Sequence, residues 1–184
     1  MKYNLEKHHR HSVRLKGYDY SCTGAYFITI CAWNRECIFG EIIEGEIKLN
    51  ACGTIVQQEW MRTRDLRPNI ELDEFVVMPN HFHGIVIINA GNICRDMARH
   101  APTGRQFAKP IANSLSTVIG AFKSSVTKLI NILRNTPGMP VWQRNYFERV
   151  IRNEKELFRI REYIRINPAQ WDIDEENPDV RIVP

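Results

Sequence analysis

The chain has 184 residues, of which 43% are hydrophobic and 25% are charged, and its formal net charge is +4. This composition is typical of one ordinary globular domain and excludes a fibrous repeat or a largely disordered chain. No apolar run approaches the ~18–20 residues that span a bilayer, and the first residues lack the apolar core of a signal peptide. We therefore expect a cytoplasmic protein whose residues 1–184 form a single domain, with no membrane partner.

The N-terminal segment, residues 1–20, is a basic arm. Five of its first sixteen residues are Lys or Arg. Such an arm can contact phosphates, although a merely solvated tail explains the charge equally well. The candidate DNA contacts in the arm are Arg10, Arg14 and Lys16. The five cysteines of the chain include no C-x-x-C pair, which argues against both a disulfide framework and a cysteine-rich zinc site.

The first half of the chain predicts mostly strands. The run GAYFITICAWN is β-branched and aromatic, as in a strand, and CIFGEIIEGEIKLN predicts two short strands with a turn at Glu44-Gly45. Residues 54–64 contain good helix formers behind a cap at Thr54. In ELDEFVVMPNHFHGIVIIN, residues 78–80 interrupt two apolar runs, which predicts a strand, a break and a second strand.

The second half predicts two helices around one further strand. Residues 89–113 lack periodicity and mix glycine, proline and basic residues, so we expect a mobile loop there. Apolar residues then recur at steps of three and four over residues 115–133, which indicates a helix. The run VWQRNYFERVI alternates like a strand, and Asn153 with Glu156 resembles a capping box that opens a final helix, which Pro168 ends.

The order of these elements favours the α+β class. Neighbouring strands mixed with helices predict a mostly antiparallel sheet with helices packed on one face, in a ferredoxin-like arrangement. We expect the acidic tail, residues 172–184, to be exposed to solvent.

Two histidines interrupt the second of the two apolar runs. Side chains alternate across a strand, so His81 and His83 should point to the same face, with Phe82 on the other. Their Cα atoms would lie roughly 6–7 Å apart, close enough for both imidazoles to bind one ion. The alternative is a pair of half-exposed, hydrogen-bonded and inert histidines at the start of a strand.

Tyr163 and Asn167 lie along one edge of the apolar stripe of the final helix. Their i,i+4 spacing makes them neighbours on the helix surface. The alternative is that Tyr163 is a packing residue with its hydroxyl in water, and that Asn167 is merely the end of the helix before Pro168.

These segments carry a resemblance. VVMPNHFHGIVII and EYIRINP resemble the H-hydrophobic-H and nucleophile motifs of the single-tyrosine HUH nucleases. RLKGYDYSCTGAYFITI, FVVMPNHFHGIVII, VWQRNYFERVIRNEKEL and REYIRINPAQW together resemble the REP-associated tyrosine transposases and their insertion-sequence relatives, in the right order and over nearly the whole chain. The resemblance implies that Tyr163 is the nucleophile and that His81, His83 and Asn167 bind a divalent metal, Mg²⁺ or Mn²⁺.

The resemblance also implies an activity and a partner. The protein would be a metal-dependent transposase that cleaves and rejoins single-stranded DNA near hairpins, such as palindromic repeats, through a 5′-phosphotyrosine intermediate. No nucleotide cofactor is expected, since the reaction conserves energy in the ester and the sequence has no G-x-x-x-x-G-K-[ST] loop. Further candidate phosphate contacts are Lys123, Lys128, Arg144, Arg149 and Arg152, and candidate base-stacking residues are Trp142, Tyr146 and Phe147. The alternative for each of them is a solvated charge or an aromatic residue of the core.

Other functions stay open at this point. The chain could be a domesticated relative that binds DNA hairpins without cutting them, or a nickase like the replication initiators and relaxases. A metallohydrolase unrelated to DNA is compatible with the two histidines alone. The sequence also does not decide between a monomer and a homodimer.

Overall fold

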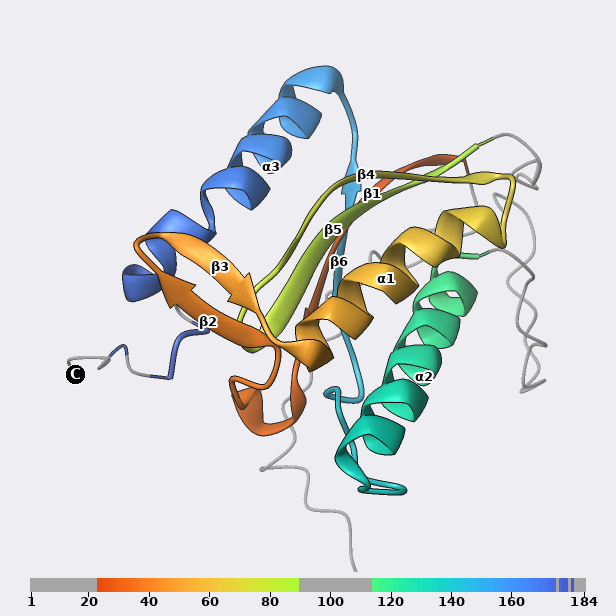
Figure 1. The fold of residues 1–184 in the computed structure, drawn as a ribbon. Helices are drawn as coiled ribbons and strands as arrows, with labels where there is room; N and C mark the ends of the chain where they lie inside the picture. The colour runs from red at the N-terminus through yellow and green to blue at the C-terminus, as the bar shows by residue number, and fades with distance from the viewer. Residues whose placement is uncertain (1–22, 90–113, 175, 179, 181–184) are drawn as a thin grey trace, which may run out of the picture.

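Four strands form the central sheet: β1 Gly24–Cys31, β4 Ile70–Val77, β5 His81–Ile88 and β6 Phe147–Ile151. The structure, a computed structural model, describes residues 23–89, 114–174, 176–178 and 180. Every neighbouring pair in the strand order β4-β5-β1-β6 is antiparallel. With helices α1, Ala51–Asp65, and α2, Leu115–Arg134, between the strands, this is the split β-α-β of a ferredoxin-like fold, so the α+β prediction is confirmed (Figure 1).

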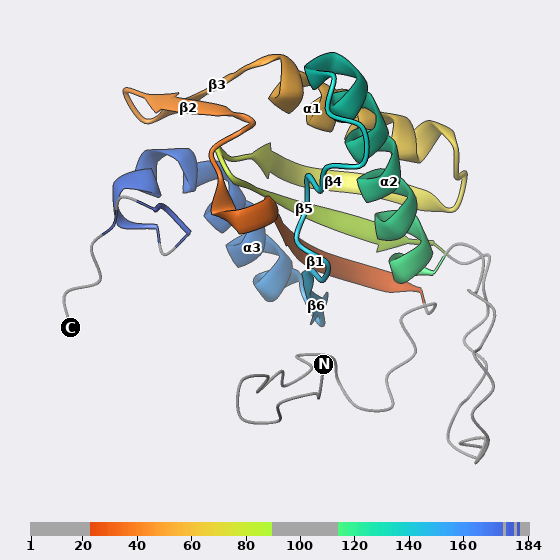
Figure 2. The same cartoon turned by 90° about the horizontal axis from the view of Figure 1, so that it is seen from below.

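The helices cover both faces of the sheet. Helices α1 Ala51–Asp65 and α2 Leu115–Arg134 pack on one face, whereas α3 Glu154–Ile166 lies on the other (Figure 2). The expectation of helices on one face therefore holds for α1 and α2 and is wrong for α3. The reason is that β1 and β5 are apolar on both faces: Tyr26 and Ile28 join the core under α1 and α2, and Phe27 and Ile85 join the smaller core under α3.

Local signals placed most elements correctly. The hairpin of β2 Gly40–Ile43 and β3 Glu46–Leu49 turns at Glu44 and Gly45, whose φ angles of 54° and 77° suit a tight hairpin turn. Helix α1 begins earlier than predicted, because Asn50 rather than Thr54 is its cap: the Asn50 side chain accepts hydrogen bonds from the backbone N–H groups of Cys52 and Gly53.

The late strand is shorter than predicted. Only Phe147–Ile151 pairs with β1, while Trp142 forms an isolated bridge with Ala32. The predicted cap of α3 is confirmed, since the Asn153 side chain accepts a hydrogen bond from the Glu156 N–H at 2.9 Å. Pro168 ends the α-helix, but the chain continues as the 3₁₀ helix η3, Pro168–Ile173.

The start of the acidic tail is not simply exposed, which corrects the prediction for residues 172–184. The segment after η3 turns back to the sheet, where the Glu176 carboxylate pairs with Arg35 at 3.0 Å and its carbonyl accepts a hydrogen bond from Asn80 at 2.6 Å. The side chain of Asp174 is only 11% exposed. A local hydrophilic pattern could not reveal these long-range contacts.

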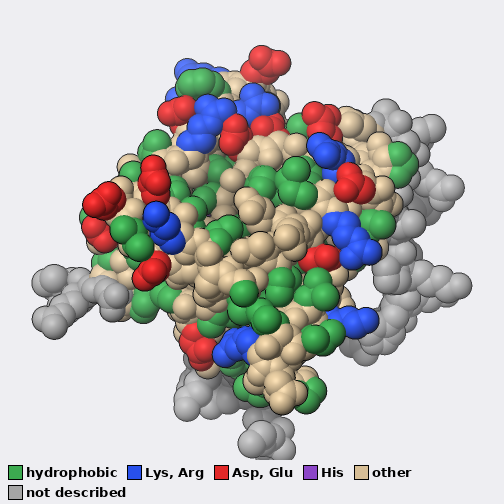
Figure 3. Space-filling model, viewed as in Figure 1, with side chains coloured by type: hydrophobic (Ala, Val, Ile, Leu, Met, Phe, Trp, Pro, Cys, Tyr) green, Lys and Arg blue, Asp and Glu red, His purple; other side chains and the backbone are tan. Residues whose placement is uncertain are grey.

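Charge on the molecular surface is mixed. Figure 3 shows Lys and Arg side chains interspersed with Asp and Glu, including over the upper part of the molecule where α3 lies. Among the helices of the described residues, none is long and apolar enough to cross a membrane. The basic arm, residues 1–20, and all but the first residue of the expected loop, residues 89–113, lie outside the described part of the chain.

Candidate active site

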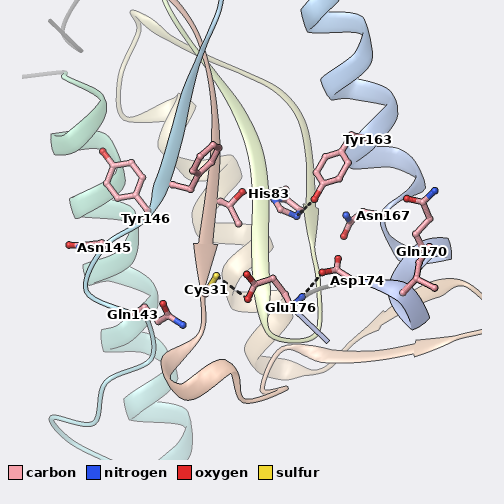
Figure 4. A pocket seen from close by; sticks show the side chains of 13 residues that line it. Cys31, His83, Gln143, Asn145, Tyr146, Tyr163, Asn167, Gln170, Asp174 and Glu176 are labelled. Atoms are coloured by element: carbon pink, nitrogen blue, oxygen red, sulfur yellow. Dashed lines mark hydrogen bonds between the residues drawn. The ribbon is translucent and has the colours of Figure 1, made fainter. Parts of the chain in front are cut away.

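A cleft of about 630 Å³ opens on the side of the sheet that carries α3 (Figure 4). Residues from the sheet, the segment before β6, α3 with its C-cap, η3 and the segment after η3 form it. Its lining includes Thr29, His83, Tyr146, Phe147, Tyr163, Asn167, Asp174 and Glu176. Residues more than 140 positions apart in the sequence thus meet at one surface.

The two histidines share one face of β5, as their spacing predicted. Their ring centroids are 4.5 Å apart, and the rings cross nearly at right angles. His83 lines the cleft, whereas His81 is fully buried beneath it, with Trp171 of η3 packed nearby at a centroid distance of 6.1 Å. Neither histidine is the half-exposed strand-end residue of the alternative interpretation.

Tyr163 brings its hydroxyl to these histidines. The Tyr163 oxygen is 3.3 Å from Nε2 of His83, while its ring packs edge-on against Phe27 and remains 42% exposed. Asn167, one turn later, is 2% exposed and keeps helical dihedral angles although Pro168 follows. The phenol and the amide predicted to be neighbours therefore both face the histidine pair.

Two ion pairs hold α3 against the sheet. Arg161 donates to both carboxylate oxygens of Asp73 through Nε at 3.0 and 3.1 Å, and Arg165 donates to Glu74 through Nε at 3.1 Å. Burial alone would raise the pKa of Asp73, but the hydrogen bonds from Arg161 and from the Glu74 N–H outweigh it and lower that pKa. These contacts from β4 fix the position of the helix that carries Tyr163.

The hydrogen-bond partners of the Nδ1 atoms bear on which ring nitrogen of each histidine carries the proton. Asn80 donates through Nδ2 to the carbonyls of Arg35 and Glu176, so its Oδ1 must be the atom that lies 2.9 Å from Nδ1 of His81. An amide oxygen only accepts, so Nδ1 of His81 carries the proton and Nε2 presents a lone pair. Thr29 Oγ1 lies 2.9 Å from Nδ1 of His83 and can donate or accept, so Nε2 of His83 accepts from Tyr163 in the tautomer whose Nδ1–H donates to Thr29.

Burial keeps both imidazoles neutral. It lowers the pKa of His81 to about 4, an effect that the nearby Asp174 carboxylate and Asn167 amide only partly oppose. It also holds the pKa of His83 well below the ordinary value, and proximity to His81 adds to this effect. At neutral pH both imidazoles are therefore uncharged, as metal ligands must be, and each has one ring nitrogen with a free lone pair.

The residues present fit a divalent cation. His81 Nε2 and Asn167 Oδ1 are buried, and neither has a hydrogen-bond partner among the described residues. Two converging lone pairs without a donor are costly unless a cation or water satisfies them. No three His, Cys, Asp or Glu side chains within the described ranges lie close enough to hold a metal. A cation here would therefore depend on the Asn167 amide and on water beside the two imidazoles.

Asn80→Ala should weaken metal binding by roughly 10- to 100-fold, as loss of a residue that orients a ligand commonly does. The variant removes the acceptor that holds the His81 tautomer, and Mn²⁺ titration measures the affinity. Nitrogen NMR of the imidazoles should also show a mixture of His81 tautomers. Asn80→Asp keeps the acceptor and should retain more affinity. Asn131→Ala, which removes a comparable hydrogen bond to Met139 at the end of α2, is the matched control; equal affinities in both alanine variants would reject the orienting role.

The metal-free protein should lose stability as the pH falls from 7.5 to 5.0. The unfolded state binds a proton to His81 near pH 6.5, and the folded state does so only near pH 4. The contribution of His81 is thus fully present above pH 6.5 and decreases below it, by roughly 2 kcal/mol at pH 5.0. Urea denaturation at both pH values measures the change. His81→Gln should show a smaller pH dependence, and an unchanged dependence would contradict the assignment.

The predicted phosphate contacts fall into two further hollows. Lys123, Lys128 and Arg144 line one of about 420 Å³, where Lys123 Nζ already donates to the carbonyls of Gln143 and Arg144. Arg149 and Arg152 line another of about 460 Å³ beside α3. Arg10, Arg14 and Lys16 lie outside the described residues. Whether any of these residues contacts DNA stays a prediction.

The three aromatic residues predicted to stack on bases differ in their exposure to the cleft. Trp142 is 5% exposed and packs against Phe39 in the core, at a centroid distance of 4.8 Å. It is therefore not available to stack on a base. Tyr146 and Phe147 line the cleft and remain candidates.

The sequence alone did not identify the residues that contact the two histidines from behind or from the side. Asn80 stands directly before His81, so the motif itself offered a signal for it. Thr29 meets His83 only through the β1–β5 register, and Asp174 approaches His81 Nε2, at 4.0 Å, only through the path of the C-terminal segment. Of the described residues around the cleft, none is Lys or Arg, whereas Asp174 and Glu176 are carboxylates.

Comparison with solved structures supports the fold. No family model matches the chain. The solved structure of a REP-associated tyrosine transposase bound to a REP hairpin has a TM-score of 0.58 and is 18% identical, covering 88% of this chain and 74% of that one. An uncharacterized protein of Haemophilus influenzae is 41% identical over 175 residues, which are 95% of this chain and 96% of the relative. The chain therefore shares the fold of the transposase and belongs to the family of the H. influenzae protein.

Proposed function

We propose that the protein is a metal-dependent transposase of the REP-associated tyrosine type, which cleaves and rejoins single-stranded DNA near hairpins. The observation that carries the proposal is the 3.3 Å approach of the Tyr163 hydroxyl to Nε2 of His83, beside buried atoms of His81 and Asn167 that find no hydrogen-bond partner in the described part of the chain. The fold shared with a transposase that is bound to a REP hairpin supports the same substrate class.

In the proposed reaction the Tyr163 oxygen attacks a phosphodiester. The new bond joins this oxygen to phosphorus, and the bond from phosphorus to the 3′-oxygen breaks. The products are a 5′-phosphotyrosine ester and a strand with a free 3′-hydroxyl, which takes up a proton. Attack by a 3′-hydroxyl on the ester reverses these steps and joins DNA without a nucleotide cofactor.

Tyr163 must lose its proton during attack. A free phenol has a pKa near 10, and Nε2 of neutral His83, which lies 3.3 Å from the hydroxyl, would accept a hydrogen bond from it in the tautomer with the proton on Nδ1. His81, His83 and Asn167 would hold Mg²⁺ or Mn²⁺, which would supply charge neutralisation at the scissile phosphate. Because one lone pair cannot bind a cation and accept this proton together, His83 can serve only one of these roles at a time.

The test is to incubate the protein with labelled single-stranded DNA hairpins and Mg²⁺ or Mn²⁺, followed by a denaturing gel. The expected result is a labelled band that survives denaturation, because the DNA is covalently attached to tyrosine. Hairpin binding without this band would identify a non-catalytic binding protein. Metal-dependent turnover of small esters without it would identify a metallohydrolase, and cleavage without rejoining would indicate a nickase of the relaxase kind.

A further inference from the structure

A basic hollow of about 460 Å³ lies between the end of β6 and the first turns of α3. Its charged lining consists of Arg149, Arg152, Lys155, Arg159 and one carboxylate, that of Glu156. Glu156 is already engaged, since it pairs with Arg149 at 2.6 Å and accepts a hydrogen bond from the Arg152 N–H at 3.0 Å. The hollow therefore keeps an excess of positive charge.

This excess is specific to one side of α3. On the side that faces β4, Arg161 and Arg165 each pair with a carboxylate of that strand. On the side of the hollow, Arg152, Lys155 and Arg159 form no ion pair with any residue that the structure describes. The cations on the β4 side are thus neutralised by carboxylates, whereas those of the hollow remain available to a ligand.

The hollow adjoins the candidate active site along two elements. On α3, Arg159 precedes Tyr163 by four residues and so lies one turn away on the same side of the helix. On β6, Arg149 follows Phe147 by two residues, which places both side chains on one face of the strand. Phe147 lines the cleft and Arg149 lines the hollow, so the cleft and the hollow are neighbours along this strand.

The charge of the cleft explains why a neighbouring cation site would be needed. The described residues of the cleft include two carboxylates and neither Lys nor Arg. A cation at the histidines would serve the scissile phosphate, but the adjacent phosphates of a bound strand would meet no positive charge within the cleft. The hollow supplies cations beside the nucleophile, because Arg159 lies one helical turn from Tyr163 and Arg152, Lys155 and Arg159 have no ion-pair partner among the described residues.

We propose that Arg149, Arg152, Lys155 and Arg159 form a phosphate-binding subsite for the single-stranded DNA that flanks the scissile phosphate. The inference rests on the proposed function for the identity of the ligand. Contacts of this kind are independent of base sequence and weaken with salt, because binding releases counterions from the strand. The subsite would hold the strand in place while the cleft positions the bond to be cut.

The test compares the wild type with the variant Arg152→Gln/Lys155→Gln/Arg159→Gln. Arg149 is kept, because it pairs with Glu156 at the start of α3. Fluorescence anisotropy with a labelled single-stranded oligonucleotide and EDTA, at several KCl concentrations, measures binding without cleavage. The variant should bind roughly 10- to 100-fold more weakly at low salt. The salt slope, the slope of the logarithm of the binding constant against the logarithm of the KCl concentration, should fall in magnitude by about 2, since each single-strand phosphate contact contributes about 0.7 to it.

The matched control is Arg64→Gln/Arg67→Gln/Arg134→Gln, which removes the same charge from the ends of α1 and α2 on the other face of the sheet. It should leave the slope nearly unchanged. Arg159→Gln alone, with an expected fall of about 0.7, covers the case of a misfolded triple variant. An unchanged slope in these hollow variants overturns the subsite, even if the wild type forms a covalent adduct. A reduced slope without any wild-type adduct supports the subsite and overturns the transposase; absence of single-strand binding overturns both.

Discussion

Tyr163→Phe is expected to reduce formation of the covalent protein–DNA adduct by at least about 1,000-fold, as loss of a catalytic nucleophile does in other enzymes. The substitution removes the phenolic oxygen that lies 3.3 Å from Nε2 of His83. It leaves the ring that packs at 6.0 Å from Phe27 and 5.2 Å from His83, so the fold and the affinity for hairpins should change little. Denaturing gels measure the adduct and anisotropy measures hairpin binding.

Tyr146→Phe is the matched control, because Tyr146 lines the same cleft from the segment before β6. This variant should keep adduct formation within about 10-fold of the wild type. Adduct formation at the wild-type rate by Tyr163→Phe would reject Tyr163 as the nucleophile. If Tyr146→Phe alone lost the adduct, the nucleophile would have to be reassigned to Tyr146.

His83→Ala is expected to weaken Mn²⁺ binding by at least about 100-fold and to abolish metal-dependent adduct formation. The substitution removes one of two imidazoles whose rings lie 4.5 Å apart, and leaves His81 and Asn167 as too few ligands. Electron paramagnetic resonance of Mn²⁺ measures the affinity directly, without DNA. Circular dichroism should confirm that this variant is folded, because the His83 side chain that it removes is only 3% exposed and stacks on Phe27 at a centroid distance of 5.5 Å.

The two main variants serve as controls for each other. Tyr163→Phe should bind Mn²⁺ about as well as the wild type, because its phenol is not among the proposed ligands. His83→Ala should still bind single-stranded DNA in EDTA, because Arg149, Arg152, Lys155 and Arg159 of the basic hollow are unchanged. A folded His83→Ala protein with wild-type Mn²⁺ affinity would refute the metal site. If such a protein also formed no adduct, His83 would instead be the base that accepts the Tyr163 proton.

The supporting geometry depends on contacts that span the chain. The pairs Asp73–Arg161 and Glu74–Arg165 join residues 88 and 91 positions apart, and the Tyr163–His83 contact joins residues 80 positions apart. Because α3 occupies the face opposite α1 and α2, it brings Tyr163 over the same side of β5 that presents His81 and His83. A prediction with all helices on one face could not have supplied this site.

What the sequence determined by itself was local. The alternation of β5 placed His81 and His83 on one face, the helical period made Tyr163 and Asn167 neighbours, and the side chain of Asn153 marked the start of α3. These features follow from periods of two and of 3.6 residues and from a cap that acts within three residues, so they need no knowledge of the rest of the chain.

What only the tertiary structure decided was which distant residues meet. The β1–β5 register places Thr29 behind His83, and the segment after η3 returns Asp174 and Glu176 to the cleft. Such contacts depend on how two faces of one sheet are covered and on which buried polar groups find partners. Both depend on the complete tertiary structure, so short-range patterns in the sequence cannot predict them.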